Sequence, residues 1–364
     1  MSRAKRIATP AAMIFFLIGV ITARDSLRIS PLVPPVNKPF QIVFRKVKGN
    51  GTGGAVLDVG TPGAFDNWVT CPSVHFDGKL YRMWYSSMFH SKDGPRGIGL
   101  ATSLDGLSWR RENGGKPVFT VAPKGAFDSA QILSPVVRFD GGTFLMWYTG
   151  IDGSQNPTRL ELERIGLAIS KDGIHWTRAN GGRPVFELGP PGSFDDVQVA
   201  YPSIIRERGY YRMWYSAYAV EYNHTIGVAR SRDGIHWERE NNAQPVRGLS
   251  PSIAYGPAVV RWRGQYLMLY TGYSTPRPWG IFGAISNDGT NWRMINDGET
   301  FVPFGMGNDF DKDNMSHPSI LPARNRLLVW YTGFNRGPSG VDPLVFRIGL
   351  AEAIIKKSRY GKER

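Results

Sequence analysis

The sequence repeats one pattern about every sixty residues, almost from end to end. The pattern is marked by an anchor tyrosine, which falls at Tyr85, Tyr148, Tyr215, Tyr270 and Tyr331, in steps of 63, 67, 55 and 61 residues. Repeats of this length without helical periodicity are typical of stacked β-sheet modules. The chain must therefore fold as copies of one small β unit.

One copy shows how such a unit is built. Residues 202–206, 211–216, 226–231 and 235–239 alternate apolar and polar side chains and are rich in aromatic and β-branched residues, which favours strands. Gly209 and Asp233-Gly234 supply the tight turns between them. Four antiparallel strands per copy predict the blade of a propeller.

The last copy lacks its outermost strand. The motif Ser-x-Asp-Gly-x-x-Trp begins at Ser103, Ser170, Ser231 and Ser286, but the chain ends before a fifth example. Residues 40–47 precede the first copy and have the sequence of an outer strand. The sequence therefore predicts an all-β fold over residues 40–355, a five-bladed β-propeller closed by this N-terminal strand, because closure removes exposed sheet edges.

The ends of the chain have a different composition. Basic residues, an apolar run from Ala11 to Ile21 and a small residue at Ala23 predict a signal peptide over residues 1–23, or a membrane anchor over residues 8–23 if it is not cleaved. Residues 24–39 form a proline-rich spacer and residues 356–364 a basic tail. We therefore expect an exported or anchored protein.

The net charge of +14 does not predict nucleic-acid binding. Residues 1–40 carry six basic and one acidic residue, and residues 356–364 carry five and one, so the predicted propeller keeps only +14 − 5 − 4 = +5. This charge is too diffuse for a phosphate-binding surface. Cys71 is the single cysteine, which excludes an intrachain disulfide.

Candidate site residues are those that break the repeat. Asp66, Asp128, Asp195 and Asp311 recur after a phenylalanine and are predicted to be scaffold, as turn or cap acceptors. Aromatic, amide and acidic exceptions gather where the innermost strands begin, and aromatic rings beside polar groups suit the faces and hydroxyls of sugars. The predicted carbohydrate-binding residues are Trp68, Gln131, Gln198, Tyr201, Tyr218, His224, Tyr255, Trp279, Asn314 and His317. Further exceptions are Phe89-His90, Asp152, Glu161, Glu163 and Asp342.

The repeated motifs resemble those of the five-bladed propeller glycosidases. Trp147-Tyr-Thr-Gly, Ile348-Gly-Leu-Ala and Ser170-Lys-Asp-Gly-Ile-His-Trp are similar to motifs of glycoside hydrolase family 43, whose relatives include invertases, levansucrases and mannoside phosphorylases. The resemblance spans about Phe40 to Ala353 and implies a carbohydrate partner. Members of the family place carboxylates before the inner-strand prolines. In the first three copies, where the family has these carboxylates, the residues here are Cys71, Ser134 and Tyr201, while the fourth and fifth copies have Gly256 and His317, so no catalytic residue carries over.

If the protein cleaves glycosides, two other carboxyl groups must act as acid and base. The predicted catalytic residues are Glu221, as an acid whose pKa Tyr218 and Tyr222 would raise, and Asp196 or Asp313 as the base. The alternatives are a non-catalytic carbohydrate-binding propeller and a phosphorylase using Arg159, Arg164, Arg277 and His224. No cofactor is expected, although the resemblance allows a central cation near His317. The sequence leaves the sugar and the oligomeric state open.

Overall fold

The computed structural model describes residues 40–87, 96–155, 161–251, 253–273, 279–323, 326–335 and 345–357. These residues belong to one compact unit, Phe40–Arg364. The predicted leader and spacer lie outside the described residues, as does the basic tail after residue 357. Every regular element in the described ranges is a β-strand or a short 3-10 turn, so the all-β prediction is confirmed. No helix in these ranges is long and apolar enough to span a membrane.

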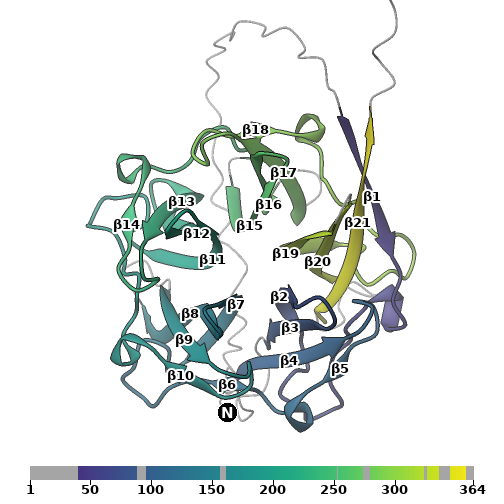
Figure 1. Ribbon diagram of the computed structural model, residues 1–364, viewed down its shortest axis with the longest axis horizontal. Coiled ribbons are helices and arrows are strands. Elements are labelled where there is room, and N and C mark those ends of the chain that lie inside the picture. Colours follow the sequence, from purple (N-terminus) through teal and green to yellow (C-terminus); the bar gives the residue numbers. More distant parts are fainter. Residues whose placement is uncertain are drawn as a thin grey trace, which may run out of the picture. The chain divides into compact units, whose positions relative to one another are not determined.

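Antiparallel pairing joins consecutive strands into groups that surround a common centre (Figure 1). The first group holds β2 (Thr70–Phe76), β3 (Tyr81–Ser86), β4 (Gly97–Ser103) and β5 (Arg110–Arg111), with β6 (Phe119–Thr120) also paired to β4. The next holds β7 (Gln131–Asp140), β8 (Thr143–Gln155), β9 (Glu161–Ser170) and β10 (Trp176–Arg178).

The remaining strands continue the same order along the chain. One group holds β11 (Gln198–Glu207), β12 (Tyr210–Ala219), β13 (Asn223–Ser231) and β14 (Glu238–Arg239). It is followed by β15 (Ile253–Trp262), β16 (Gln265–Tyr273), β17 (Trp279–Ser286) and β18 (Arg293–Met294). Last come β19 (Asn314–Ala323), β20 (Arg326–Phe334) and β21 (Arg347–Lys357). The 3-10 turns are η1 (Thr52–Gly54), η2 (Asn113–Gly115), η3 (Asn180–Gly182), η4 (Asn241–Ala243) and η5 (Asn296–Gly298).

Strand β1 (Phe40–Val47) pairs with β21 over its whole length, from Phe40 opposite Lys357 to Val47 opposite Leu350. The two strands, from opposite ends of the chain, lie side by side in Figure 1. Lys46 on β1 reaches the buried carboxylate of Asp311, with 2.6 Å between Nζ and Oδ2. The N-terminal strand therefore covers the edge of β21 and contributes a cation to the last group.

Three of the other groups have an arginine in the place of this lysine. Tyr215 and Arg239 both donate to Oδ2 of Asp195, at 2.9 and 2.7 Å, and Asp195 is fully buried. The same trios are Asp66 with Tyr85 and Arg111, Asp128 with Tyr148 and Arg178, and Asp311 with Tyr331 and Lys46. The prediction that these aspartates belong to the scaffold is thus correct. Their role as turn acceptors is corrected, since they anchor the outer strand through a buried ion pair.

The hydrophobic cores lie between neighbouring groups. One cluster joins Trp147 and Leu167 of the β7–β10 group to Ile204 and Met213 of the β11–β14 group. The tryptophans also make polar links, because Nε1 of Trp147 donates to the carbonyl of Gly234 at 2.9 Å.

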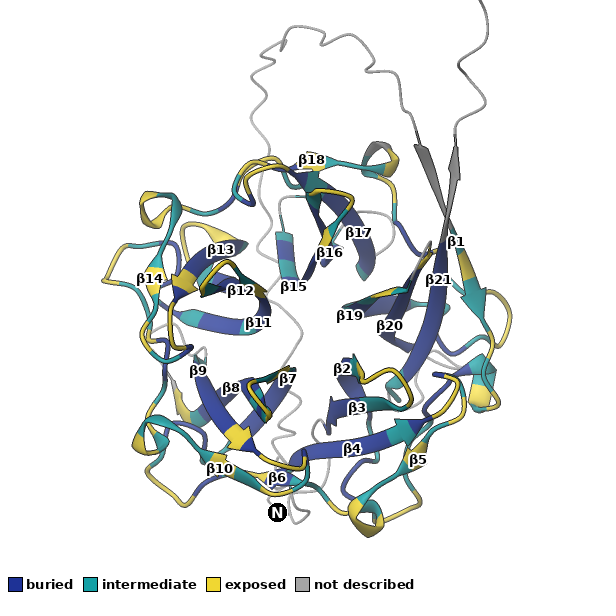
Figure 2. Cartoon of the chain, in the orientation of Figure 1, coloured by how far each residue is buried: buried dark blue, intermediate teal, exposed yellow. Residues whose placement is uncertain are grey.

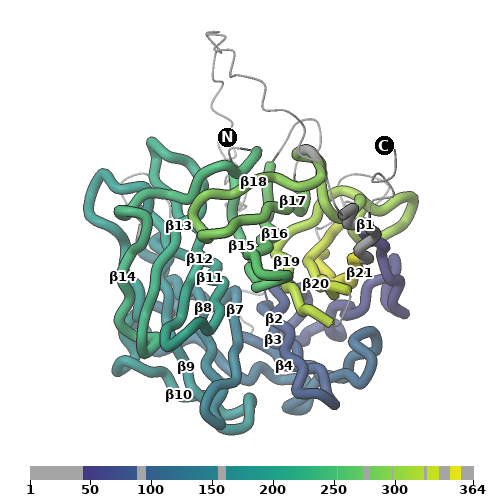
Figure 3. Tube along the Cα trace, turned by 45° about the horizontal axis from the view of Figure 1, so that its top comes forward, coloured from purple at the N-terminus to yellow at the C-terminus, as the bar shows by residue number. Residues whose placement is uncertain are grey.

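In Figure 2 the inner strands are mostly dark blue and the outer turns yellow, and in Figure 3 β10, β14 and β18 lie toward the outside.

Candidate functional site

A bulge in each innermost strand turns the residue before its proline toward the centre. The strand pairing shifts register there, as between Ala200 and Ser203 in β11. The residue before the proline has a positive φ, 48° at Tyr201 and 50° at His317, which is rare for residues other than glycine. The same irregularity occurs at Cys71 in β2, Ser134 in β7 and Gly256 in β15.

Hydrogen bonds between groups hold these bulges in place. The backbone N–H of Tyr201 donates to Oγ1 of Thr149 in the preceding group at 2.9 Å, and that of His317 donates to Oγ1 of Thr271 at 2.9 Å. The same link connects Ser134 to Ser86, Gly256 to Ser216 and Cys71 to Thr332. Because Thr332 lies on β20 and Cys71 on β2, the last group is bonded to the first.

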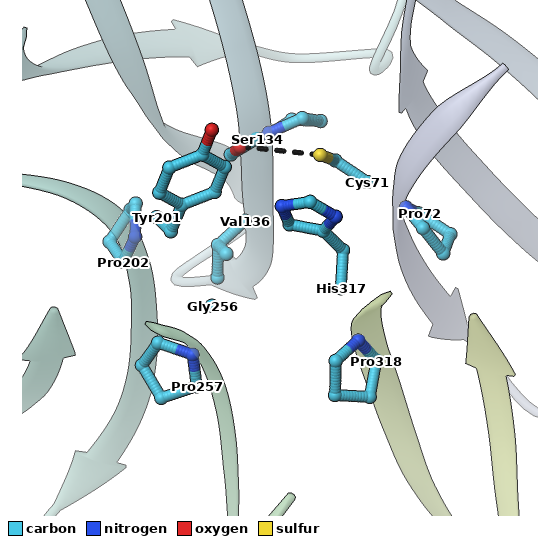
Figure 4. A pocket seen from close by; sticks show the side chains of 11 residues that line it. Cys71, Pro72, Ser134, Val136, Tyr201, Pro202, Gly256, Pro257, His317 and Pro318 are labelled. Atoms are coloured by element: carbon cyan, nitrogen blue, oxygen red, sulfur yellow. Dashed lines mark hydrogen bonds between the residues drawn. The ribbon is translucent and has the colours of Figure 1, made fainter. Parts of the chain in front are cut away.

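The bulged residues and their prolines line one cavity, where the His317 ring lies between Tyr201 and Cys71 (Figure 4). The volume open to the centres of water-sized molecules is about 40 Å³, enough for a few ordered waters. Nε2 of His317 is buried without a hydrogen-bond partner among the described residues, and burial lowers the pKa of His317 to about 3. Burial raises the pKa of the Cys71 thiol to about 11.

This cavity does not fit the central cation that the resemblance allows. His317 offers one neutral nitrogen, whereas Cys71 is a protonated thiol and none of the lining residues is a carboxylate. Among the described residues, no three His, Cys, Asp or Glu side chains gather as a metal site would require.

From Tyr201 and His317, which line the cavity, aromatic and imidazole rings continue toward the face where the inner strands begin. The ring centroids of Tyr255 lie 5.9 Å from Tyr201, 5.4 Å from His317, 5.2 Å from Trp279 and 5.9 Å from His224. Burial lowers the pKa of His224 to about 4, so both histidines of the wall are neutral at pH 7. We call this set the aromatic wall: Tyr201, Tyr218, His224, Tyr255, Trp279 and His317.

The structure brings the residues predicted to bind carbohydrate into one connected set. The Tyr218 ring lies 4.6 Å from His224, and Tyr218 is paired with Gln198 across β11 and β12. Asn314 is paired with Trp279, and Trp68 packs with Tyr201 against Leu133 and Ile151. Gln131 lies opposite Ile151, which is itself opposite Glu163.

Glu163 is an acidic side chain beside this set, since it lies opposite Ile151 and acts electrostatically on Tyr201. It faces the β11–β14 group, and Nε2 of Gln198 lies 3.4 Å from its Oε1. Burial, with a smaller contribution from Glu161, raises the pKa of Glu163 to about 8. Glu163 is therefore mostly protonated at neutral pH, as a group that donates a proton to a leaving oxygen must be.

Two further carboxylates are Glu161, at the start of β9, and Asp152, near the end of β8. Burial raises the pKa of Glu161, against the opposing effect of Arg96. Asp152 is bonded to Arg164, with 2.6 Å between Oδ2 and Nη2. Burial alone would raise the pKa of Asp152, but hydrogen bonds from Ser154 and the charge of Arg164 bring it below its usual value.

The carboxylates predicted to be catalytic occupy other places. Glu221 is exposed in the turn between β12 and β13, and Tyr222 beside it is 45% exposed, so the aromatic enclosure predicted for Glu221 is absent. Asp196 accepts a hydrogen bond from the backbone N–H of Gly192 at 2.7 Å. Asp313 lies directly before β19, and its backbone N–H donates to the carbonyl of Phe334.

A signal in the sequence could have singled out Glu163. Glu161, Glu163, Ile165 and Leu167 lie on the same side of β9, and Ile165 and Leu167 are core residues. A carboxylate that continues a buried face is costly to keep charged, which favours a functional role. Of the other sequence candidates, Phe89-His90, Arg159, Arg277 and Asp342 lie outside the described residues.

Comparison with known proteins relates the chain to carbohydrate-active families. The family described as the glycosyl hydrolases family 32 N-terminal domain matches residues 71–247. An uncharacterized protein of Mycobacterium tuberculosis is 28% identical over 282 residues, 72% of this chain and 87% of the relative. A 1,2-beta-oligomannan phosphorylase of Thermoanaerobacter sp. is 27% identical over 180 residues, 49% of this chain and 56% of the relative.

Solved structures with a similar fold include a glycoside hydrolase with a TM-score of 0.64 and 17% identity, matched over 87% of this chain and 94% of that one. A family 32 beta-fructofuranosidase of Bombyx mori, solved as a mutant with sucrose, matches with a TM-score of 0.59 and 15% identity over 81% of this chain and 61% of that one. These likenesses establish the propeller fold.

Proposed function

Because the chain belongs to the propeller glycosidase superfamily, we propose that it breaks glycosidic bonds of an oligo- or polysaccharide, with Glu163 as the proton donor. The strand groups are then the blades of a five-bladed ring, which β1 completes by pairing with β21. The substrate binds where the inner strands begin, between the aromatic wall and the start of β9.

The observation that carries this proposal is the environment of Glu163. The side chain is a carboxyl group with a pKa of about 8, beside an amide and within a set of aromatic side chains. An acid that keeps its proton at neutral pH is what protonation of a departing sugar oxygen requires. The ionised partner that hydrolysis also requires stays the prediction made from the sequence, Asp196 or Asp313, although both lie outside the set around Glu163.

The test is a screen of aryl glycosides and of plant and microbial polysaccharides for both hydrolysis and binding. On any substrate that is cleaved, Glu163→Gln should lower kcat by at least 100-fold, because general acid catalysis contributes about 10²–10⁴ in rate. Glu221→Gln is the matched control, since Glu221 is an exposed glutamate of the next group. Equal activity of wild type and Glu163→Gln would refute the assignment, and binding without cleavage by the wild type would favour a binding module.

Phosphorolysis is a second candidate, favoured by the similarity to the oligomannan phosphorylase. A phosphorylase would release a sugar phosphate and would need inorganic phosphate for turnover, whereas a hydrolase would release a free sugar without it. Digestion of β-1,2-mannooligosaccharides with and without phosphate separates the two reactions.

We also propose that the protein is exported. The proposal rests on the basic start and apolar run before Ala23. Expression of the full chain with fractionation of cells and medium, followed by N-terminal sequencing, tests both export and cleavage.

A further inference from the structure

We infer that the face of the propeller opposite the strand starts docks onto the surface of an anionic membrane. We call it the strand-end face: it carries the turns in which the innermost strands end and the turns that contain the repeated Ser-x-Asp-Gly motif. The inference rests on exposed aromatic side chains, on the distribution of charge and on the place where the first and last described residues lie. It is independent of the proposed reaction.

Exposed apolar side chains are concentrated at the strand-end face. Among the described residues seven large apolar side chains are exposed, and four of them lie in these turns or directly beside them: Phe76, Leu104, Phe139 and Ile169. Val220 and Tyr222 lie instead in the turn between β12 and β13, at the opposite face. The two faces therefore differ in the apolar surface that they offer.

The aromatic members of this set form one patch across two neighbouring strand groups. Phe76, the last residue of β2, is 37% exposed and stacks on Tyr81 with 4.2 Å between the ring centroids. Phe139, near the end of β7, is 50% exposed. The ring of His75, next to Phe76 in β2, lies 6.3 Å from Phe139 and 6.0 Å from Phe144, and so connects the two groups. Connected exposed rings of this kind mark a site of protein or membrane contact.

The first and last described residues also lie at the strand-end face. Ile354 in β21 is opposite Arg326, the first residue of β20, which directly follows a turn of this face. Strand β21 continues three residues further, to Lys357, where it is paired with Phe40 at the start of β1. The two strands thus extend about 10 Å beyond Arg326. The leader, the proline-rich spacer and the basic tail are therefore all joined to the propeller at this face.

Most of the net charge of the chain belongs to the same side. The strand-end turns carry ten basic and seven acidic side chains, 10 − 7 = +3, over residues 76–82, 104–109, 138–144, 171–176, 206–210, 232–237, 261–265, 287–292 and 326. Residues 1–40 contribute +5 and residues 356–364 contribute +4. This face and the two segments joined to it thus carry +12 of the net charge of +14, which attracts an anionic surface to this side of the molecule.

Basic side chains also flank the aromatic patch. Lys79 is exposed in the turn after β2, and Lys171 is exposed in the turn after β9. The acidic side chains of the two hairpins that carry Phe76 and Phe139 are already in ion pairs, Asp77 with Arg82 and Asp140 with Arg206. Aromatic rings flanked by lysine and arginine suit the bilayer interface, because the rings enter the boundary of the acyl chains while the cations approach the lipid phosphates.

The charge also distinguishes a membrane from a second copy of the chain. Two copies docked through the strand-end face would bring two positively charged surfaces together, which repulsion between like charges disfavours. Docking on a bilayer directs the opposite face, where Glu163 lies at the start of β9, away from the lipid. A leader that stays uncleaved would tether the propeller by the side that docks.

The experiment places one environment-sensitive dye on either face of the full chain. Cys71 is the single native cysteine and is buried, so a thiol-reactive nitrobenzoxadiazole dye labels an introduced cysteine. Leu104→Cys puts the dye at the strand-end face, and Val220→Cys is the matched probe at the opposite face, since both side chains are apolar and exposed. Emission is measured with phosphatidylcholine vesicles and with vesicles that contain about 30% phosphatidylserine.

We expect the dye at position 104 to gain at least twofold in emission on the anionic vesicles, with less than half of that gain on the neutral ones, and the dye at position 220 to stay unchanged on both. Equal gains at the two positions, no gain at position 104, or the same gain on both kinds of vesicle would overturn the inference. A change at position 104 that depends on protein concentration without vesicles would overturn it in favour of a second copy.

Two sets of variants in the Leu104→Cys chain identify the groups responsible. Phe76→Ser with Phe139→Ser should reduce the gain in emission at least twofold, whereas Val220→Ser with Tyr222→Ser should leave it unchanged. Lys79→Glu with Lys171→Glu should reduce it likewise without disturbing a ring contact. Lys116→Glu with Lys124→Glu makes the same change in net charge at exposed positions outside the strand-end turns and should have the smaller effect. A full gain in both the Phe76 and the Lys79 double variants would contradict docking through this patch.

Discussion

At the scale of single residues, the assignment of the catalytic acid depends on which carboxyl group is removed from solvent. The aromatic and amide residues that break the repeat could be found from the sequence, because subtraction of a repeat needs only an alignment of its copies. The acid could not be found in this way, because Glu161, Glu163, Asp196 and Glu221 all break the repeat. What distinguishes Glu163 from the exposed Glu221 is its place on the buried side of β9, half-buried opposite Gln198.

The raised pKa of Glu163 predicts a pH-dependent effect on stability. In the unfolded chain this carboxyl ionises above about pH 4.5, whereas in the folded protein it stays protonated up to about pH 8. The free energy of unfolding is therefore highest, with respect to this group, below pH 4.5, where both states are protonated. It falls as the pH rises toward 8, because only the unfolded chain releases the proton. Glu163→Gln should be more stable than wild type by about 4 kcal/mol at pH 8, because each pKa unit corresponds to about 1.4 kcal/mol, and close to it in stability at pH 4.5.

Urea unfolding at both pH values measures this difference. Glu221→Gln is the control, because an exposed glutamate with the same substitution should show no such dependence. A Glu163→Gln variant that is no more stable than wild type at pH 8 would mean that Glu163 is ionised in the folded protein.

Cys71 gives a second prediction at this scale. Its thiol is buried and has a pKa of about 11, so very little reactive thiolate exists at pH 8. Iodoacetamide at pH 8 should leave the folded protein unmodified and should label one site after denaturation in urea. Rapid labelling of the folded protein, followed by mass spectrometry, would show that the central cavity opens.

At the scale of elements, the sequence was most informative where the repeat is regular. The motif Ser170-Lys-Asp-Gly-Ile-His-Trp forms the predicted hairpin, because Oδ1 of Asp172 accepts the backbone N–H groups of Ile174 and His175, each at 2.8 Å. The bulges could not be predicted, since nothing local shows that a residue before proline will adopt a positive φ. They depend on Ser and Thr side chains of the preceding group.

The pairing of β1 with β21 makes a prediction about the N-terminal strand. Lys46 takes the place of the arginine in the other trios, and Lys46→Met would leave the buried Asp311 with a hydrogen bond from Tyr331 but no cation. We expect a loss of about 3 kcal/mol in the free energy of unfolding, because an uncompensated buried charge costs this much.

Lys46→Arg is the matched control and should keep most of the stability, since arginine fills this role at Arg111, Arg178 and Arg239. Deletion of residues 1–39 should likewise preserve cooperative unfolding, and deletion of residues 1–47 should abolish it. If Lys46→Met leaves the melting temperature unchanged, β1 does not complete the last group.

At the scale of the whole molecule, the arrangement of the inner strands determines where a substrate could be bound and cleaved. The resemblance to propeller glycosidases correctly indicates the superfamily, but the carboxylates that it implies before the inner-strand prolines are replaced by Cys71, Ser134 and Tyr201. Those positions instead line the central cavity, and none of its lining residues is a carboxylate. We therefore assign the proposed chemistry to Glu163 at the start of β9, which is paired with Gln198 and acts electrostatically on Tyr201.

The central claim is that Glu163 donates a proton to the leaving group. The most direct test compares the kcat/KM of Glu163→Gln and wild type on two glycosides of the same sugar, one an unactivated oligosaccharide and the other carrying 2,4-dinitrophenol, which leaves without protonation. The account predicts at least a 100-fold loss on the oligosaccharide and less than a tenfold loss on the dinitrophenyl glycoside. Equal losses on both substrates, or no loss on either, would contradict it.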